Sequence, residues 1–393
     1  MEETKEMKKG SIKVCHLTSA HRRYDVRILE KQCVSLASRG YDVTLIVNDD
    51  KEDEIHKGVK ILSTGLQPKS RRERFSMAKK LVTAKALEVD ADLYQFHDPD
   101  LLSLGMKLKS MGKTVIFDSH EDVPASIKSK GWIPKSLRGV VARLYEAKEK
   151  KALRKIDAAI SVTPHILERL ALSAKHTELI TNYPIIRDKS KQEDQQKDQR
   201  ELQQAASESD SADPAICFAG GITAQWNHHH ILTAIQAMGK VKYYLAGGGN
   251  EGYLEELKAH PAWEKVEYLG RITHKEVQEI YGKSRVGMAL NYAKQIEGRG
   301  TLGNTKLFEY MEAELPILCS DYALWKELVE KHRCGISVNP ADPEAIEQAM
   351  RTLLDNPEEA KAMGKRGRQA VLQEYNWKTQ EDRLVALYEK VLE

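Results

Sequence analysis

A repeated alternation of short apolar runs and amphipathic helices, broken once by a long polar segment, constrains the fold of this chain most. Six candidate strands precede the polar segment, at Ile12–Leu17, Asp42–Val47, Val59–Leu62, Leu93–Phe96, Thr114–Asp118 and Ala158–Val162. Six follow it, at Ile216–Ala219, Val241–Ala246, Val266–Leu269, Val286–Leu290, Pro316–Cys319 and Gly335–Val338. Candidate helices of the first half lie at Arg27–Ser38, Arg74–Leu87, Leu101–Met111 and Pro164–Leu172. Such alternation predicts an α/β chain with two doubly wound parallel sheets.

The polar segment Arg187–Pro214 reads RDKSKQEDQQKDQRELQQAASESDSADP and has almost no apolar residue. A segment of this composition buries too little surface to fold, which is typical of a linker or a mobile insertion. We therefore expect an amino-terminal Rossmann-like domain over 1–186, a flexible connection over 187–214 and a second Rossmann-like domain over 215–374. A last amphipathic helix is expected over 375–393.

Composition bounds the class of protein. The 393 residues suffice for two sizeable cores, and a formal net charge of +3 is too small to predict nucleic-acid binding. No apolar run is long enough to cross a bilayer, and the charged start MEETKEMKKG is not typical of a secretory signal, so we expect a cytoplasmic protein. The five cysteines are scattered without a CxxC pair, so buried reduced thiols are expected.

Polar side chains follow three strands of the first half. Thr18 follows the first strand, His97 and Asp98 follow the fourth, and His120 and Glu121 follow the fifth. Ligands of doubly wound sheets bind beyond the carboxyl ends of the strands, where a histidine can bond to a hydroxyl or to developing negative charge. Two other interpretations stay open. The histidines could bridge backbone groups, with the aspartates as helix caps, or bind a metal, although no recognised ligand spacing is present.

Glycine-rich turns follow the first two strands of the second half. Gly220 and Gly221 follow the first strand, and Gly248 lies in the turn after the second. Glycine lets a backbone approach a ligand closely, although strand-to-helix turns often contain it without such a role. The sequence has neither GxGxxG nor GxxxxGK[ST], which argues against an NAD enzyme and a P-loop ATPase. The tract His228–His230 is expected to begin a helix rather than to bind a metal, because consecutive helical side chains point in different directions.

The stretch Gly303–Asp321 carries the most specific pattern. A Gly-Asn turn opens an amphipathic helix, so the first amides of that helix are unpaired and lie at its positive dipole end, which suits a phosphate. Glu309 lies about one turn further along, where a carboxylate can accept hydrogen bonds from two neighbouring hydroxyls, such as those of a ribose. The pattern predicts a nucleotide diphosphate site, although a glutamate near a helix start is often only a surface residue.

Three blocks of the sequence together resemble the family-four retaining glycosyltransferases. They are HLTSAHRRYDVRILEKQCVSLASRGYDVTLI, FHDPDLLSLGMKLKSMGKTVIFDSHEDVP and NTKLFEYMEAELPILCSD. The resemblance covers nearly the whole chain, and the first two blocks are similar to members that build capsular or other cell-surface polysaccharides. It implies the GT-B fold, in which two Rossmann-like domains face each other across a cleft and the last helix packs back on the first domain.

The resemblance also implies roles for single residues. Glu309 matches the second glutamate of the family's E-x7-E motif, which binds the donor ribose, and His120 matches the histidine near the transferred sugar. These two are the expected catalytic residues. The expected donor-binding residues are Gly220, Gly221, Gly248, Asn304, Thr305, Lys306, Leu307, Glu309 and Arg299. The residues expected on the acceptor and sugar side are Thr18, His97, Asp98 and Glu121.

Two positions depart from the family pattern. The first glutamate of the motif would fall at Thr301, and the nearest acid is Glu297. The basic pair that neutralises the donor phosphates is missing, because positions 221–238 hold no lysine or arginine. Three other cations could replace that pair, namely Lys294, Arg299 and Lys306. These departures bear on turnover more than on fold.

The resemblance implies transfer of a sugar from a nucleotide diphosphate to a hydroxyl of a glycan or polyprenyl-linked acceptor, with anomeric retention. No metal and no cofactor are expected beside that co-substrate, and a UDP-sugar is favoured over a GDP-sugar. Two alternatives stay open. One is a non-catalytic subunit that activates a partner transferase, which the two departures favour. The other is a sugar-nucleotide epimerase that shares the GT-B fold.

Two basic segments, Lys69–Lys85 and Lys128–Lys155, lie in the first half. The second places Trp132, Ile133 and Leu144 among many cations, a pattern typical of a helix on an anionic membrane surface. An ordinary solvated helix packed on its sheet explains the pattern equally well. With a lipid-linked acceptor, the membrane interpretation predicts peripheral association with the inner face of the cell membrane.

Overall fold

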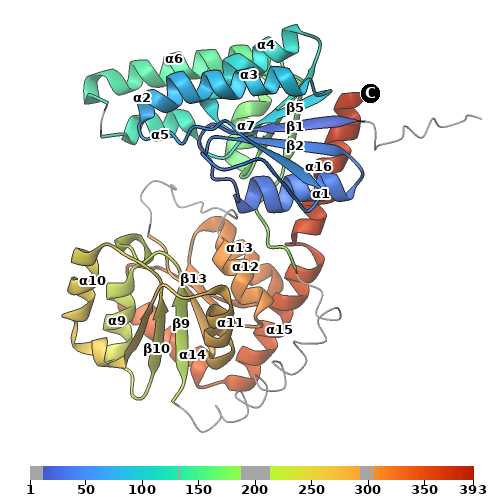
Figure 1. Cartoon of the computed structure of the whole chain (residues 1–393). Helices are drawn as coiled ribbons and strands as arrows, with labels where there is room; N and C mark the ends of the chain where they lie inside the picture. The colour runs from blue at the N-terminus through green and yellow to red at the C-terminus, as the bar shows by residue number, and fades with distance from the viewer. Residues whose placement is uncertain (1–11, 132, 187–212, 293–301, 303–304) are drawn as a thin grey trace, which may run out of the picture. The chain divides into compact units, whose positions relative to one another are not determined.

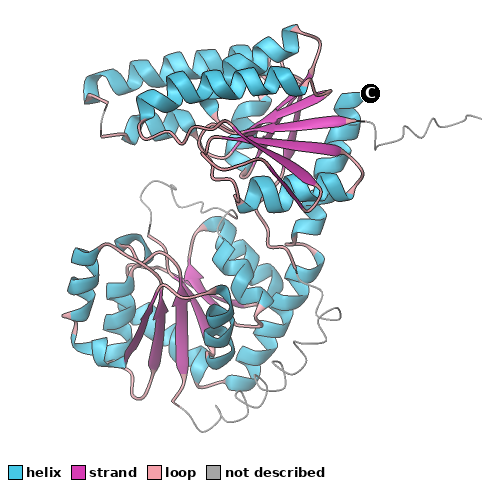
Figure 2. Cartoon of the chain, viewed as in Figure 1, coloured by secondary structure: helices cyan, strands magenta, loops and turns pink. Residues whose placement is uncertain are grey.

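The computed structural model describes residues 12–131, 133–186, 213–292, 302 and 305–393. The expected connection over 187–214 therefore lies outside the described residues, except for its last two positions. The chain divides into two compact units, unit 1 (Met1–Asn182 and Trp377–Glu393) and unit 2 (Tyr183–Asn376) (Figure 1). Each unit is a sheet covered by helices on both faces, so the predicted α/β fold with two doubly wound sheets is confirmed (Figure 2).

Unit 1 contains an eight-stranded sheet in the order β3-β4-β2-β1-β5-β6-β7-β8. Its strands are β1 (Lys13–Leu17), β2 (Asp42–Val47), β3 (Glu54–His56), β4 (Val59–Ser63), β5 (Leu93–Phe96), β6 (Thr114–Ser119), β7 (Ala158–Ser161) and β8 (His176–Leu179). The edge strand β3 runs antiparallel to β4, and the other described pairings are parallel. Strand order reverses between β1 and β5, which creates the switch point where α/β sheets bind ligands.

Helices cover both faces of the unit 1 sheet. The π-helix η2 (Val26–Cys33), α1 (Val34–Ser38) and α16 (Trp377–Leu392) share one core with the strands. The other face is covered by α3 (Lys79–Val89), α4 (Leu102–Ser110), α6 (Lys135–Leu153) and α7 (Pro164–Ala171). Shorter elements are α2 (Arg71–Glu73), the π-helix η3 (Arg74–Ala78), η4 (Pro99–Leu101) and α5 (Val123–Ser129). Side chains alternate between the two cores along β1, where Val14 faces α16 and Cys15 faces α3.

Unit 2 contains a six-stranded sheet in the order β11-β10-β9-β12-β13-β14, and its described pairings are parallel. Its strands are β9 (Ala215–Ala219), β10 (Lys242–Ala246), β11 (Val266–Gly270), β12 (Val286–Ala289), β13 (Ile317–Ser320) and β14 (Gly335–Val338). Its order reverses between β9 and β12. The central strand β9 is buried along its whole length, as expected of a parallel strand between two helical layers.

The helices of unit 2 also form two layers. One contains α9 (His228–Gln236), α10 (Glu251–Lys258), η8 (Pro261–Lys265) and α14 (Pro343–Leu354). The other contains α11 (His274–Lys283), α12 (Thr305–Glu312), α13 (Ala323–His332) and α15 (Pro357–Gln373), with the short η7 (Ala224–Trp226) after β9. Side chains define the helix starts: Thr273 and Glu276 form a capping box on α11, and Asp342 caps α14.

The twelve strands expected from the sequence are all present, with ends within one residue of the expected positions. The expectation missed β3 and β8, because β3 has three residues and β8 is a half-buried strand with a polar sequence, HTEL. The five cysteines are buried and free, as expected. Within the described ranges, no helix is long and apolar enough to cross a membrane.

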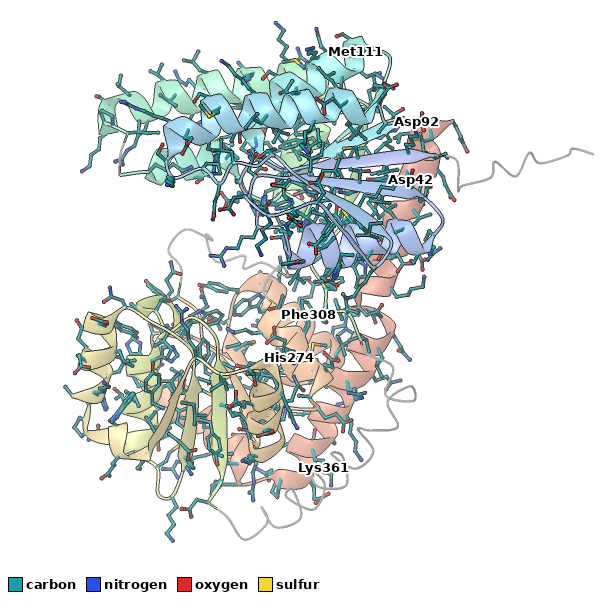
Figure 3. The ribbon with its side chains drawn as sticks, in the orientation of Figure 1. Asp42, Asp92, Met111, His274, Phe308 and Lys361 are labelled. Atoms are coloured by element: carbon teal, nitrogen blue, oxygen red, sulfur yellow. The ribbon has the colours of Figure 1, made fainter. Side chains whose placement is uncertain are left out.

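Functional side chains cluster at one edge of each sheet. Asp42 and Asp92, which are labelled in Figure 3, mark the amino-terminal ends of β2 and β5. The polar side chains predicted from the sequence lie at the opposite edge, beyond the carboxyl ends of β1, β5 and β6. In unit 2, the glycine turns likewise follow the carboxyl ends of β9 and β10.

Candidate active site

A fully buried carboxylate, Asp118 at the end of β6, organises the unit 1 site. The guanidinium of Arg27 binds it through Nε at 3.2 Å and Nη2 at 2.9 Å. Gln32, one turn of the π-helix later, donates from Nε2 at 2.7 Å. Burial opposes ionisation, but the charge of Arg27 and the hydrogen bond from His120 outweigh it and hold the pKa of Asp118 well below its usual value. The carboxylate is therefore ionised and accepts hydrogen bonds only.

The proton positions around Asp118 follow from this acceptor. Because Gln32 donates its amide hydrogen to the carboxylate, its oxygen accepts from Nε2 of Gln95 on β5. The oxygen of Gln95 then accepts the hydroxyl hydrogen of Tyr388 on α16, at 2.7 Å. Tyr388 has only one hydrogen to donate. The 3.1 Å contact between its oxygen and Nε2 of His16 therefore requires a hydrogen on the imidazole.

The tautomers of two buried histidines follow in turn. Burial lowers the pKa of His16 well below its usual value, so His16 is neutral and keeps its one hydrogen on Nε2. Its Nδ1 then accepts from Nε2 of His97, at 3.0 Å. Burial also lowers the pKa of His97, to about 4, so the Nδ1 of His97 carries a lone pair. That lone pair lies 3.3 Å from Nε2 of His120 and 3.2 Å from Asp118.

His120 closes this network. Its Nε2 lies 3.1 Å from Asp118 Oδ2 and 3.3 Å from His97 Nδ1, and both of these atoms are acceptors. The hydrogen of His120 therefore lies on Nε2, between them. Its other nitrogen, Nδ1, is an acceptor in the neutral imidazole, on a side chain that is 17% exposed. The arrangement can fix one orientation of His120 and present an acceptor nitrogen to a hydroxyl.

Asp98 organises a second cluster at the same edge. Its Oδ2 accepts from the Thr18 hydroxyl and from the Ser19 amide, each at 2.7 Å. Its Oδ1 lies 3.3 Å from Nδ1 of His21. Burial lowers the pKa of His21, but the pairing with Asp98 outweighs burial, so the pKa is raised and the imidazolium is favoured. The ring of His21 contacts that of His120 edge-on, at 4.8 Å between centroids, so the two clusters are continuous.

The unit 1 structure therefore brings together four residues expected from the sequence, namely Thr18, His97, Asp98 and His120. Glu121 is exposed and its carboxylate has no hydrogen bond within the described chain. The interpretation in which Asp98 caps a helix is not supported, because its carboxylate binds the loop after β1 and makes no cap bond to η4. Asp122 does cap a helix, α5.

The unit 2 site centres on Glu309 of α12. Its half-buried carboxylate accepts a hydrogen bond at Oε2 from the Tyr281 hydroxyl, at 3.1 Å. Burial, together with the charge of Glu309, raises the pKa of Tyr281, so the tyrosine stays a donor. No hydrogen bond from a described residue reaches the other oxygen, Oε1. Glu309 is thus oriented through one oxygen, and the other can accept from a ligand.

Lys306 lies in the first turn of α12 and reaches back to β9. Its ammonium donates to the backbone oxygen of Ala219 and lies 4.8 Å from the ring centre of Phe218. A Cβ at Gly220 would lie 2.1 Å from the Lys306 nitrogen, so this ammonium occupies the space that a side chain at position 220 would take. Burial lowers the pKa of Lys306, although Glu309 acts in the opposite direction. A cation therefore lies at the glycine turn where the sequence lacks the family's basic pair.

The turn after β10 adds a second cation. Gly247 has φ of +139°, and a Cβ there would lie 1.7 Å from the carbonyl oxygen of Gly220, so the two glycine turns pack backbone to backbone. A Cβ at Gly248 would lie 2.5 Å from Nε of Arg271, which follows β11. Gly221 has open space at its Cβ position. Arg271 thus lies against the turn that contains Gly248.

Several expected donor-binding residues lie outside the described part of the chain. They are Asn304 and Arg299. The candidate replacement cation Lys294, the motif position Thr301 and its nearest acid Glu297 lie outside it as well. Thr305 begins α12, and Leu307 is fully buried in the core, where its side chain packs but only its backbone can face a ligand. His228, the first residue of the histidine tract, is buried and bonds to Tyr243, as a core histidine does.

Metal binding can be tested against the same geometry. His97, Asp118 and His120 are the group of described residues whose ligand atoms lie close enough, within 4.8 Å of one another. Asp118 is already bound at both oxygens by Arg27, and a metal ion would lie beside that guanidinium. Its Oδ2 also accepts from Gln32. The donor set therefore fits a hydrogen-bond network better than a cation site.

Sequence reasoning missed the residues behind the site. Arg27 and Gln32 are polar positions five apart in η2, and only the fold shows that both bind the strand-end aspartate Asp118. Tyr388 gives no local signal, because it is 372 positions from His16. Arg271 and Tyr281 are ordinary polar residues in the sequence, and only the fold brings them to the glycine turns and Glu309.

The chain matches two protein families. Residues 26–180 match the “Glycosyl transferase 4-like domain” and residues 199–370 match “Glycosyl transferases group 1”. The search of curated proteins found no match.

Solved structures share the fold at low identity. A sucrose-phosphate synthase from Thermosynechococcus elongatus is 16% identical with a TM-score of 0.71, over 97% of this chain and 99% of that one. Alr3699/HepE of Anabaena, solved with UDP-glucose, is 13% identical with a TM-score of 0.65, over 96% and 100%. WaaG, a glycosyltransferase involved in lipopolysaccharide biosynthesis, is 12% identical with a TM-score of 0.66, over 95% and 99%. With both family domains in order and two Rossmann-like units, this chain belongs to the family-four glycosyltransferases of the GT-B fold.

Proposed function

We propose that this glycosyltransferase moves a sugar from a nucleotide diphosphate sugar to an acceptor hydroxyl with retention of the anomeric configuration. The observation that carries the proposal is the meeting of Glu309, Lys306 and the glycine turns at one edge of the unit 2 sheet. A carboxylate with one oriented oxygen suits a ribose diol, and a cation beside open backbone suits a diphosphate. HepE, which has a similar fold, was solved with UDP-glucose. This supports a nucleotide sugar as the donor of this chain and favours a UDP-sugar over other nucleotide sugars.

In this proposal the protein assists the departure of the diphosphate. Charge that develops on the leaving group would be stabilised by the Lys306 ammonium and by the first amides of α12. These groups would provide the positive charge without a metal or a further cofactor. Lys306 is held by Ala219 before a donor binds, so little reorganisation is needed when charge develops. Arg271, beside Gly248, is the second candidate for a phosphate contact.

On the unit 1 side, His120 would hold the transferred sugar. Asp118 and His97 fix its Nε2 hydrogen, so Nδ1 can accept a hydrogen bond from a sugar hydroxyl. Thr18, Asp98 and His21 continue this edge and are proposed to belong to the acceptor side. The acceptor would be a glycan or a polyprenyl-linked glycan, in synthesis of a surface polysaccharide, as the resemblance of the first two sequence blocks suggests.

Association with the inner face of the cell membrane is part of the proposal. The helix α6 exposes Leu137, Val140, Val141 and Leu144, which follow helical spacing along one face. Lys135, Arg143, Lys148 and Lys151 are exposed on the same helix. Apolar side chains beside cations are typical of a helix that lies on an anionic bilayer. Ile133, which was expected on the membrane face, is instead buried.

Release of nucleotide diphosphate tests the proposal. A transferase slowly hydrolyses its donor when water replaces the acceptor, so incubation with UDP-, GDP-, dTDP- and ADP-sugars should release free nucleotide diphosphate from one of them. The Lys306→Met protein should release it at least tenfold more slowly, because the leaving-group charge loses its cation. A non-catalytic subunit would release none from any donor, and an epimerase would interconvert the sugar of the intact donor.

A further inference from the structure

A cavity of about 810 Å³ opens at the carboxyl edge of unit 1 beside the His21–Asp98 cluster. Its walls come from the loops after β1, β2 and β4 and from the start of η3. The volume lies in the range of sites that enclose a small molecule, about 300–1,000 Å³. His21 lines the cavity and its ring also contacts His120, so an occupant would lie next to the residue proposed to hold the transferred sugar.

The cavity is strongly cationic. Its lining has five basic side chains, Arg22, Arg23, Lys51, Lys69 and Arg74, and two acidic ones, Asp49 and Asp50, which leaves three positive charges. Arg23 is neutralised, since it binds Asp49 at 2.7 Å and Glu54 at 3.0 Å. The side chains of Arg22, Lys51 and Lys69 form no ion pair with any described acid. The excess charge is therefore available to an anion.

Two buried polar atoms, one on Arg74 and one on Asp100, have no hydrogen-bond partner in the described chain. The Nε of Arg74 is buried without a hydrogen-bond acceptor, and Oδ1 of Asp100 is buried without a donor. The two side chains approach only to 3.7 Å, which is too far for a hydrogen bond. Ser19 holds the other oxygen of Asp100 at 2.8 Å. Buried groups of this kind normally have partners. Arg74 lines the cavity, so an acceptor atom on a ligand there would complete its Nε.

We propose that this cavity binds the phosphate group of a phosphorylated acceptor. A guanidinium fork and lysines match a phosphate, which carries more charge than a carboxylate and accepts several hydrogen bonds. The hydroxyls of the attached sugar would meet Ser19 and the His21 side of the cavity. The start of the basic segment Lys69–Lys85 thus acquires a role in substrate binding.

The inference rests on the proposed transfer only where it identifies the bound ligand as the acceptor. Binding of a phosphate group to the cavity can be measured by itself. The probe is inorganic pyrophosphate, titrated by calorimetry into the full chain in excess UDP, which blocks the donor site. We expect saturable binding that falls at least tenfold in the double variant Lys69→Gln/Arg22→Gln and in Arg74→Gln. The matched control is Arg72→Gln, an exposed arginine two residues from Arg74 that does not line the cavity, and it should bind like wild type.

Competition then identifies the source of the phosphate. Glucose 6-phosphate represents a soluble phosphosugar, and polyprenyl phosphate in detergent micelles represents a lipid acceptor. Displacement of pyrophosphate by either supports the inference and names the source. Equal displacement by glucuronic acid would overturn the phosphate assignment, and so would equal binding of pyrophosphate to wild type and both cavity variants. Donor binding without a pyrophosphate site would overturn this inference alone, whereas a pyrophosphate site without donor binding would overturn the proposed transfer.

Discussion

At the scale of single residues, His120 has one nitrogen fixed and one available. Asp118 and His97 accept the hydrogen on its Nε2, so the ring is oriented before any substrate arrives. A contact of this kind acts mainly when the sugar moves toward the transition state. We expect His120→Ala to bind nucleotide diphosphate like wild type but to lose at least a hundredfold in transfer, about 3 kcal/mol. Calorimetry and product formation check this. Undiminished transfer would return His120 to a structural role.

Sequence patterns predicted residues that lie at strand ends but not the residues that orient them. Thr18, His97, Asp98 and His120 could be found because each lies within two residues of the end of an apolar strand. Arg27 and Tyr388 could not, since the first lies within a helix and the second near the carboxyl end of the chain. Their roles depend on which elements pack together, and local sequence patterns do not predict this packing.

At the scale of elements, α16 contributes to the site through Tyr388. The hydroxyl of Tyr388 bonds to Gln95 and His16, and so determines which nitrogen of His97 carries a hydrogen. Tyr388→Phe would leave two buried polar groups without a partner and destabilise the fold by about 1–3 kcal/mol. We also expect slower transfer with unchanged affinity for the nucleotide.

Nitrogen-15 NMR of histidine provides the direct readout for Tyr388. Wild type should contain His16 and His97 as tautomers protonated at Nε2, and Tyr388→Phe should change at least one of them. Tyr41→Phe is the matched control, since Tyr41 lies edge-on to Tyr388 but its hydroxyl forms no hydrogen bond to a described residue. Tautomers protonated at Nδ1 in wild type would contradict the proton positions derived from Asp118.

The helix α6 carries the prediction about membranes. We expect wild type to sediment at low salt with vesicles that contain anionic lipid and to be released by high salt, because each cation near such a surface contributes about 1 kcal/mol. Arg143→Gln/Lys148→Gln should weaken this binding about tenfold or more. The control is Lys361→Gln/Lys365→Gln on α15, where Lys361 is labelled in Figure 3. If the two double variants behave alike, the exposed face of α6 has another role.

Strong alternation made the elements predictable. Most of the predicted strands are largely buried runs of apolar residues, such as β9, and burial on both faces leaves a continuous apolar signal. The edge strands β3 and β8 were missed because an edge strand can be half exposed and polar. The interpretation of Lys128–Lys155 as one helix was also incomplete, since α5 ends at Ser129 and α6 begins at Lys135.

At the scale of the whole molecule, both units contain buried neutral histidines that make stability depend on pH. Burial lowers the pKa of His97 in unit 1 to about 4 and that of His228 in unit 2 to about 3. An unfolded histidine titrates near 6.5, so between pH 6.5 and 4 the unfolded chain binds protons that the folded chain does not. The free energy of unfolding should therefore fall as pH decreases through this window, by about 3 kcal/mol for His97 at pH 4.

Chemical denaturation between pH 4.5 and 7.5 measures this dependence. The depressed pKa of Asp118 contributes stability that is lost only as pH falls below the usual aspartate range, so it does not cancel the effect of the histidines. His97→Gln removes one titrating group and should flatten the unit 1 transition in this window. A free energy of unfolding that stays constant from pH 7 to 4.5 would contradict the assignment of neutral buried histidines.

The central claim is that unit 2 holds a nucleotide diphosphate sugar through Glu309, and calorimetry of donor binding tests it most directly. Wild type and two variants of α12, Glu309→Gln and Glu312→Gln, should be titrated with the donor that wild type binds among UDP-, GDP-, dTDP- and ADP-sugars. We predict that Glu309→Gln weakens binding by about 1–3 kcal/mol, the effect of losing a charge-assisted hydrogen bond, and that Glu312→Gln binds like wild type. Equal affinity of Glu309→Gln and wild type, or no binding of any donor to wild type, would contradict the account.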